Sequence, residues 1–278
     1  MPMIGTTRAD IRDLKGVHLF HFATSNCSQR VRLVLEEKAV GWQSHHVDLA
    51  AGENTAPEFI ALNPRGLVPV MVHDGCTIVE SNDIISYVDQ SFPGPGLTPA
   101  DARDLAFMHT SLQSSSAYQG AIKLLTHEFL FKAVRRLNAR QLLAYERVTE
   151  NAELIAFMRE FSSADGFPRA RIMAAVEETQ TILQTLEERL LQHAWLTGDN
   201  YGLTDISWIV NLHRLQHMNY PLKAFPHVAR WLARVRARPG FRRAISRFES
   251  RKMVAFFRLY TATRQLRGSS VRNFVRAS

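Results

Sequence analysis

The sequence predicts a two-domain chain, in which an N-terminal α/β domain precedes an all-helical domain. Three observations support this division. Short apolar runs typical of strands disappear after Pro99. Residues 91–96 read Ser-Phe-Pro-Gly-Pro-Gly, a composition typical of a linker. Beyond the linker, apolar residues recur at steps of three and four, as in amphipathic helices.

These observations set the expected boundaries. We expect a loose leader over residues 1–16, an α/β domain over 17–92, a linker over 93–100, a helical domain over 101–250 and a basic C-terminal extension over 251–278.

The chain of 278 residues is 46% hydrophobic, enough for one large core or two moderate ones. It has no run of about 18 apolar residues, so we expect no membrane span. Its start lacks the apolar core of a secretory signal, and its two cysteines exclude a disulfide scaffold. We therefore expect a cytoplasmic protein.

The net charge of +8 is concentrated toward the C-terminus. From Ile206 onward, Glu249 is the only acidic residue. A basic end of this kind can contact nucleic acid or an anionic membrane. A solvated helix face and a frayed tail explain it as well, and we favour that explanation, with neither a membrane nor a nucleic acid as partner.

The expected N-terminal elements begin with a strand over residues 17–22 and a polar loop over 23–28. A helix follows over residues 29–40 and ends at Gly41, which can adopt the left-handed conformation. The next strand spans residues 42–49. A strand, a helix and a second strand predict a right-handed parallel crossover.

The second half of this domain contains an expected hairpin. A short helix begins at Pro57. The β-branched-rich runs 70–73 and 76–79 are joined by Asp-Gly, the pair preferred in tight hairpin turns. Ser81 then occupies the N-cap position expected for the following helix. The free N–H groups at such a helix start can bind a carboxylate.

In the second domain we expect helices over residues 101–125, 128–145 and 169–191, with a break at Gly166-Phe167-Pro168. Asp205 lies three residues after Gly202, which is the spacing of a capping box with glycine at the cap. Glycine caps a helix nearly as well as serine, at a cost of a few tenths of a kcal/mol. Beyond Phe248, apolar residues are expected to pack over the helical domain, among them Val254, Phe256, Phe257, Leu259 and Tyr260.

The run from Asn63 to Pro69, followed by Glu80-Ser81, resembles the glutathione-binding domain of glutathione transferases, and the resemblance covers nearly the whole chain. It implies a thioredoxin-like fold for the first domain and glutathione as co-substrate. It also implies that the backbone of Val68 pairs with the tripeptide and that Pro69 is cis. Glu80 and Ser81 would take the γ-glutamyl end.

Two further positions follow from the same resemblance. Asn54 matches the position that holds the glycyl end of glutathione, although an ordinary surface asparagine remains an alternative. Leu67 replaces a polar residue common two positions before the cis proline, so one contact would be missing. Arg65 could substitute as an anion contact.

A glutathione thiol has a pKa near 8.5, about that of free cysteine, so catalysis needs a group that stabilises the thiolate. Ser25-Asn26-Cys27-Ser28 precedes the first helix and is similar to the zeta-class motif. On that match Ser25 is the donor and Asn26 takes the place of a second serine. Alignment with bacterial β-etherases instead gives this role to Ser28 or its neighbour. Cys27 leaves open a mixed disulfide with glutathione, as in omega-like transferases, or a packed small side chain.

The second substrate would lie between the domains, against the helix that begins at Asp101. The candidates by position are Met108, Leu112, Ser115, Tyr118 and Gln119. We expect no metal site, because the adjacent His45 and His46 lie on a strand and face opposite sides.

Within the family, the sequence is most similar to glutathione-dependent β-etherases, which displace an aryloxide from a β-aryl ether. The resemblance implies a hydrophobic electrophile and a homodimer. A zeta-like isomerase or dehalogenase remains open. So does a non-enzymatic scaffold that binds a partner through its basic C-terminus, because a fold does not determine a function.

Overall fold

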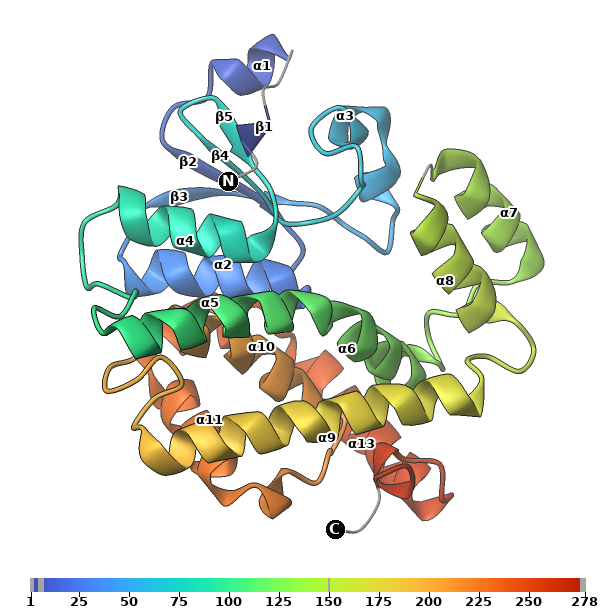
Figure 1. The fold of residues 1–278 in the computed structure, drawn as a ribbon. Coiled ribbons are helices and arrows are strands. Elements are labelled where there is room, and N and C mark those ends of the chain that lie inside the picture. The colour runs from blue at the N-terminus through green and yellow to red at the C-terminus, as the bar shows by residue number, and fades with distance from the viewer. Residues whose placement is uncertain (1–2, 5–7, 150, 276–278) are drawn as a thin grey trace.

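The computed structural model describes residues 3–4, 8–149 and 151–275. A sheet with its helices forms one part of the molecule, and a helical domain packs below it in the view of Figure 1. The sheet has the strand order β1-β5-β4-β2-β3. Its strands are β1 (Met3–Ile4), β2 (Val17–His21), β3 (Trp42–His46), β4 (Val70–His73) and β5 (Cys76–Ile78).

The central pairings agree with the expected crossover and hairpin. β2 is parallel to β3, and β4 is antiparallel to both β2 and β5. In the expected loose leader, residues 1–2 and 5–7 lie outside the described part of the chain, but residues 3–4 and 8–16 are ordered on the domain. Met3 pairs with Ile78 at the sheet edge, and helix α1 (Ala9–Arg12) buries Ile11 in a small core cluster with Phe59. Burial of a large apolar side chain fixes this segment to the domain.

The N-terminal domain contains α2 (Asn26–Glu37), the 3₁₀ turn η1 (Glu53–Thr55), α3 (Pro57–Ile60) and α4 (Ser81–Ser91). Helix α2 begins three residues earlier than expected, because Ser25 serves as its N-cap. Helices α2 and α4 lie between the sheet and the helical domain (Figure 1). The start of each helix is therefore close to the boundary between the domains.

The helical domain consists of α5 (Ala102–Ala117), α6 (Gln119–Thr126), the π-helix η2 (His127–Phe131), α7 (Ala139–Val148), α8 (Ala152–Ser162), α9 (Arg169–Gln192), α10 (Leu203–His217), η3 (Leu222–Ala224), α11 (Pro226–Ala237), α12 (Pro239–Ala244), η4 (Ser246–Phe248), α13 (Arg251–Leu266) and η5 (Val271–Asn273). The break at Gly166 is confirmed, since its φ is +71° and α9 begins three residues later.

Two helix expectations are wrong. The segment 101–125 divides at Tyr118 into α5 and α6. The segment 128–145 is not one helix, because a π-helix and a turn precede α7. Asn138 then starts α7 by accepting from Gln141 N at 2.9 Å, while the Gln141 side chain accepts from Asn138 N at 2.9 Å. This reciprocal cap stabilises a new helix start inside the expected helix.

Helix α10 is buried along most of its length and begins at a dense set of hydrogen bonds. The Asp205 carboxylate accepts from Leu196 N (2.9 Å), Gly202 N (3.0 Å), the Thr197 hydroxyl (2.8 Å), Thr197 N (3.2 Å) and Trp231 Nε1 (2.6 Å). The Asp205 half of the expected capping box is thus confirmed. The Thr197 hydroxyl in turn accepts from Thr204 N at 3.2 Å and replaces the missing cap hydroxyl. A Cβ atom at Gly202 would lie 2.2 Å from Leu97 O, so only glycine fits there.

The basic C-terminal extension is packed on the helical domain over residues 251–275, which corrects the expectation of a frayed tail there, while residues 276–278 lie outside the described part. Phe257 on α13 is 3% exposed and Val271 is 1% exposed. Arg264 forms an ion pair with the buried Glu128. Leu259, by contrast, is 68% exposed and does not pack as expected.

Candidate active site

The loop before α2 places a hydroxyl at the start of that helix. Ser25 is half-buried, and its Oγ accepts from Ser28 N at 3.3 Å as the N-cap. The hydroxyl proton of Ser25 has no acceptor among the described residues. A hydroxyl oxygen that accepts one bond can still donate another. Ser25 can therefore donate to an anion held at this helix start, where the helix dipole also favours negative charge.

The neighbours of Ser25 are directed elsewhere. Ser28 is fully buried, and its Oγ accepts from Phe22 N at 3.3 Å. This burial contradicts the alternative in which Ser28 contacts the thiolate. Asn26 and Cys27 face the helical domain, where Asn26 Nδ2 donates to Asn211 Oδ1 at 3.2 Å and Cys27 Sγ lies 3.6 Å from Gln119 Oε1.

Two buried arginines hold three consecutive carbonyls of this loop. Arg32 donates to Phe22 O at 3.3 Å and to Ala23 O at 2.7 Å. Arg214, on α10, donates to Thr24 O. Burial lowers the pKa of Arg32 to about 9 and that of Arg214 to about 10, so both guanidiniums remain charged at neutral pH. Sequence reasoning missed both residues.

The buried His21 ring completes this support and is the source of a predicted acid sensitivity. Arg32 donates to His21 Nδ1 at 3.0 Å, and His21 Nε2 lies 2.8 Å from the Ser44 hydroxyl. A proton on Nδ1 would face the guanidinium directly. Burial, and then the charge of Arg32, accordingly lower the pKa of His21 to about 3.

We expect His21 to lower the free energy of unfolding by ~2 kcal/mol between pH 7 and pH 5. As pH falls below about 6.5, the unfolded chain binds a proton that the folded chain refuses until about pH 3. Glutamine keeps an acceptor for Arg32 and a donor for Ser44, but it does not titrate. Urea unfolding at both pH values should therefore show a smaller loss for His21→Gln than for the unsubstituted protein. Equal losses would contradict this assignment.

The start of α4 forms the second half of the site. Glu80, not Ser81, is the N-cap residue, with φ of +63° and no capping side chain, so the expected register is shifted by one residue. Ser81 is the first helical residue, and its Oγ accepts from Arg30 Nη1 at 2.7 Å. Arg30 is 1% exposed and donates its remaining bonds to Ser207 O. An uncapped helix start with a buried guanidinium behind it favours a carboxylate.

The segment that would pair with an extended peptide is held by its own side chains. The Val68–Pro69 peptide bond is cis, as the resemblance implies. Val68 is half-buried and precedes β4. Asn63 Nδ2 donates to Leu67 O at 2.7 Å, and the buried Asn54 donates to Gly66 O at 2.9 Å. The amide nitrogen of Asn54 therefore orders this loop, and its expected role at a glycyl end stays a prediction.

Arg65 and Glu80 are paired with each other across the mouth of the site. Arg65 Nη1 lies 2.5 Å from Glu80 Oε1, and both side chains are more than half exposed. Such a pair contributes little to stability and separates easily. Both groups are therefore available to the charged ends of a bound peptide.

Four of the five expected second-substrate residues lie in the core, which corrects their assignment to a cleft. Met108 and Leu112 are buried. Ser115 Oγ is 2.5 Å from Ser207 Oγ, and Tyr118 OH is 2.7 Å from Thr179 Oγ1. Position along α5 could not reveal which face points inward. Gln119 alone reaches the active-site loop, at Cys27.

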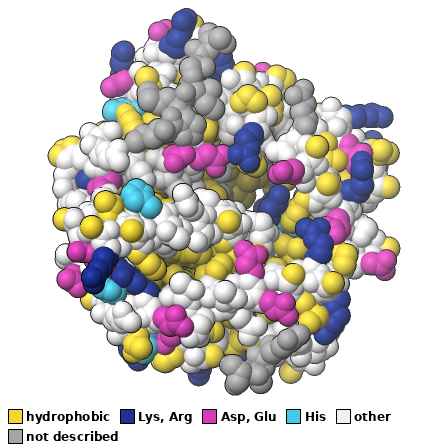
Figure 2. Space-filling view, in the orientation of Figure 1, with side chains coloured by type: hydrophobic (Ala, Val, Ile, Leu, Met, Phe, Trp, Pro, Cys, Tyr) yellow, Lys and Arg dark blue, Asp and Glu magenta, His cyan; other side chains and the backbone are white. Residues whose placement is uncertain are grey.

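The surface is hollowed between the loop after α3, helix α6 and the α7–α8 pair, with hydrophobic surface inside the hollow (Figures 1 and 2). Asn151, between α7 and α8, donates to Arg65 O at 3.1 Å. The helical domain thus contacts the loop before the cis Pro69 at the edge of this cleft. The sequence analysis did not predict α8, so it missed the side of the cleft that the α7–α8 pair forms.

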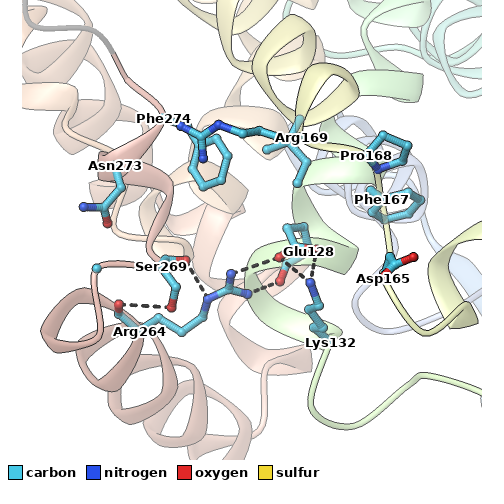
Figure 3. Close-up of a pocket in the computed structure, with 12 residues that line it drawn as sticks. Glu128, Lys132, Asp165, Phe167, Pro168, Arg169, Arg264, Ser269, Asn273 and Phe274 are labelled. Atoms are coloured by element: carbon cyan, nitrogen blue, oxygen red, sulfur yellow. Dashed lines mark hydrogen bonds and ion pairs between the residues drawn. The ribbon is translucent and has the colours of Figure 1, made fainter.

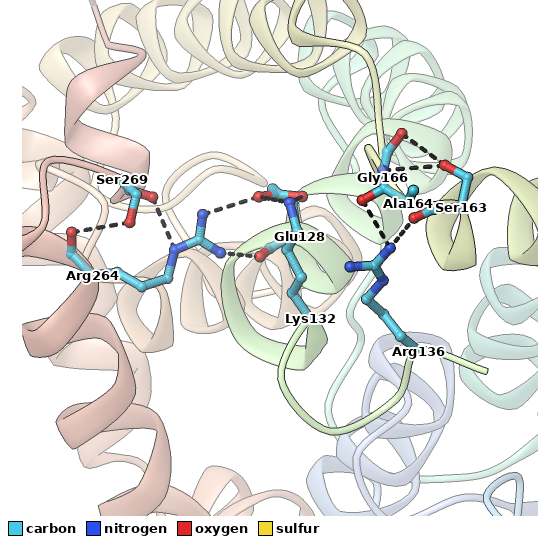
Figure 4. Close-up of polar contacts among 8 residues, drawn as sticks. All are labelled: Glu128, Lys132, Arg136, Ser163, Ala164, Gly166, Arg264 and Ser269. Carbon is cyan, nitrogen blue, oxygen red and sulfur yellow. Dashed lines mark hydrogen bonds and ion pairs between the residues drawn. The ribbon is translucent and has the colours of Figure 1, made fainter. Parts of the chain in front are cut away.

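A second hollow, of about 580 Å³, lies between the start of α9 and the C-terminal extension (Figure 3). At its base, the buried Glu128 carboxylate pairs with Lys132 and Arg264, each at 2.9 Å (Figure 4). Nearby, Arg136 donates to Ser163 O and Ala164 O. The charged groups of Glu128, Lys132 and Arg264 are paired with one another, and the lining of the pocket includes no residue of the N-terminal domain. We assign this pocket a structural role in fixing the extension.

One cluster in the described part of the chain has the spacing of metal ligands. His213 Nε2 and His217 Nε2 lie 2.9 and 3.2 Å from Glu249 Oε1. Burial alone would raise the pKa of Glu249, but the hydrogen bonds from both histidines outweigh it and hold that pKa well below its usual range. Glu249 is also the counter-ion of the buried Arg32 and Arg214, whose charges oppose a divalent cation. We therefore assign the cluster a structural role.

Comparisons with known proteins agree with this geometry. Residues 19–96 match the glutathione S-transferase N-terminal domain, and residues 144–234 match the glutathione S-transferase C-terminal domain. Glutathione S-transferase 1 of Dianthus caryophyllus is 30% identical over 192 residues, which cover 68% of this chain and 73% of the relative. The chain therefore belongs to the glutathione S-transferase superfamily, whose co-substrate is glutathione.

Two other relatives are similar over most of the chain. Maleylacetoacetate isomerase of Pseudomonas aeruginosa is 25% identical over 230 residues, covering 81% of this chain and 94% of the relative. The crystal structure of the beta-etherase LigF from Sphingobium sp. strain SYK-6 superposes with a TM-score of 0.74 at 25% identity, covering 82% of this chain and 98% of that structure. The expected combination of a thioredoxin-like domain and a helical domain is confirmed. Among the described residues, no helix has the length and hydropathy needed to cross a bilayer.

Proposed function

We propose that this chain transfers glutathione to an electrophilic carbon, with Ser25 donating a hydrogen bond to the thiolate. The observation that carries the proposal is the unused hydroxyl proton of Ser25 at the start of α2. The peptide would lie along Val68, with its γ-glutamyl carboxylate at the start of α4 near Ser81. Glu80 and Arg65 would meet its charged ends. Asn26 and Cys27 shape the same loop from the side of the helical domain.

The finer proposal is cleavage of a β-aryl ether next to a ketone. Similarity to the beta-etherase LigF supports it. In this step the glutathione sulfur attacks the ether-bearing carbon while the thiol proton passes to solvent. The carbon–sulfur bond forms as the carbon–oxygen bond breaks. The aryloxide leaves with the electron pair and then takes up a proton.

Incubation with glutathione and a β-aryl ether ketone tests this proposal. We expect stoichiometric release of the phenol and formation of the thioether, both followed by chromatography and mass spectrometry. The matched control is the same dimer with its ketone reduced to an alcohol, since the carbonyl activates the adjacent carbon. If the protein conjugates a generic electrophile but releases no phenol from the β-aryl ether ketone, glutathione transfer is retained and the β-etherase assignment is rejected.

A zeta-like isomerase or dehalogenase is the second candidate. The Ser25–Ser28 motif and the similarity to maleylacetoacetate isomerase favour it. In such an isomerase the thiolate adds to a conjugated double bond and then leaves again, so glutathione is regenerated. Unchanged glutathione concentration during turnover of a cis-enedione would support this alternative.

The scaffold alternative loses support because part of the basic extension is used internally, where Arg264 pairs with Glu128. Failure to bind immobilised glutathione would revive it. We also propose a homodimer, as the resemblance implies. Light scattering should give twice the 31.6 kDa of one chain, and a value near one chain would reject the dimer.

A further inference from the structure

Arg135 lies beside the loop that carries Ser25, and its guanidinium has no hydrogen-bonded partner in the described part of the chain. It lies in the turn after η2, and its guanidinium carbon is 5.8 Å from the centroid of the Phe22 ring and 5.0 Å from that of Phe131. The side chain is half-buried. Within residues 8–149 and 151–275, its guanidinium makes these ring contacts but no ion pair and no hydrogen bond. Asp48 attracts it only at a longer distance.

The surroundings of Arg135 are aromatic and positively charged. The Arg214 guanidinium carbon is 6.0 Å from the Phe131 centroid while the same side chain donates to Thr24 O. His127 contacts Phe131 edge-on at 5.5 Å, and burial lowers its pKa to about 3, so it adds no charge at neutral pH. Two guanidiniums therefore share one phenylalanine ring next to the loop that carries Ser25.

We infer that Phe22, Phe131 and Arg135 bind the second substrate, and that this substrate is an aromatic electrophile carrying an anionic group, a carboxylate or a phenolate. The inference rests on the proposed glutathione transfer and names its substrate class. Phenyl rings offer an apolar surface for an aromatic ring. A guanidinium presents a fork of donors that fits a carboxylate, and it binds more strongly when partly removed from water.

A pair of substrates that differ in one charge provides the test. The neutral member is 1-chloro-2,6-dinitrobenzene, and the anionic member is 4-chloro-3,5-dinitrobenzoate, which carries a carboxylate on the same dinitrochloroarene. In both, glutathione sulfur bonds to the ring carbon, chloride leaves with the electron pair, and the thiol proton passes to solvent. The measured quantity is the ratio of kcat/KM for the anionic substrate to that for the neutral one.

We expect Arg135→Gln to lower this ratio by about 10-fold to 100-fold, as loss of a charge-assisted hydrogen bond requires. The loss should appear mainly as a higher KM for the benzoate, because the contact exists before and during the reaction. Arg135→Lys should keep part of the preference, since lysine keeps the charge but not the fork. The matched control, Arg140→Gln, removes an equal charge from exposed α7 and should leave the ratio unchanged. An unchanged ratio in Arg135→Gln, or an equal change in Arg140→Gln, would overturn the inference.

A binding measurement separates this inference from the proposed function. 3,5-Dinitrobenzoate lacks a leaving group, so its affinity does not depend on turnover. Calorimetry should show tighter binding of this anion than of 1,3-dinitrobenzene, and Arg135→Gln should remove the difference. If the protein conjugates neither chloroarene but binds the anion more tightly in this Arg135-dependent way, the proposed glutathione transfer is rejected and the anion-binding site is retained. If it conjugates both chloroarenes without selectivity in binding or rate, the anion-binding site is rejected and glutathione transfer is retained.

Discussion

Replacement of Ser25 by alanine is expected to lower kcat/KM for glutathione conjugation about 100-fold, the usual effect of removing one donor to a reacting anion. The hydroxyl proton of Ser25 is unused, and it lies where the α2 dipole favours a thiolate. Without it, the pKa of bound glutathione rises and less thiolate is present at neutral pH. The pH–rate profile should therefore move to higher pH. Initial rates with 1-chloro-2,4-dinitrobenzene between pH 6 and about 9 measure both effects.

Ser28→Ala is the matched control, because it removes a hydroxyl three residues away, in the first turn of α2. The Ser28 hydroxyl accepts from Phe22 N inside the protein, so its loss should cost about 1 kcal/mol of stability without moving the pH–rate profile. Ser25→Ala also removes a helix cap, at a cost of ~1 kcal/mol, so the melting temperature of each variant must be measured. A larger rate loss in Ser28→Ala than in Ser25→Ala would reverse the assignment.

Replacement of Asp205 by alanine is expected to lower the free energy of unfolding by about 4 kcal/mol or more. Its carboxylate is fully buried and accepts five hydrogen bonds, three from Leu196 and Thr197 in the preceding loop, one from Gly202 at the start of α10 and one from Trp231 on α11. Alanine leaves these donors buried and without acceptors, and each costs about 1–3 kcal/mol if it stays unsatisfied. Chemical denaturation followed by tryptophan fluorescence would measure the loss.

Asp199→Ala is the control for this prediction. Asp199 lies in the same loop but is exposed, so its substitution should change stability by less than about 0.5 kcal/mol. Asp205→Asn should fall between the two variants. The asparagine side chain keeps one acceptor oxygen. Its amide group replaces the second carboxylate oxygen and faces the donors that bonded to that oxygen. A loss below about 1 kcal/mol for Asp205→Ala would show that water or local rearrangement satisfies the freed donors.

Local patterns in the sequence were sufficient for much of the fold and part of the site. The Asp74-Gly75 hairpin, the break at Gly166 and the carboxylate cap from Asp205 each depend on a few adjacent residues, and the structure contains all three. Ser81 was misplaced by one residue because Glu80 adopts a positive φ, which no residue type signals. The break near Lys132 was missed because the flanking sequence has helical propensity throughout.

Long-range contacts account for what the sequence could not show. Arg214 reaches Thr24 across 190 positions, and Arg264 reaches Glu128 across 136. Arg135 approaches Phe22 through an irregular turn. None of these arginines differs in local pattern from the exposed arginines around it. Their roles depend on which helix faces which, and that is decided by the packing of the whole chain.

The carbonyls of Phe22, Ala23 and Thr24 accept hydrogen bonds from both domains. Arg32 on α2 donates to the first two, and Arg214 on α10 donates to the third. An N-terminal half severed from the rest of the chain would lose the second of these anchors. Its Ser25 loop would then be held by Arg32 alone. If Ser25 activates glutathione as proposed, catalysis would therefore require both halves of the chain and would begin only once the later half has been synthesised and has docked.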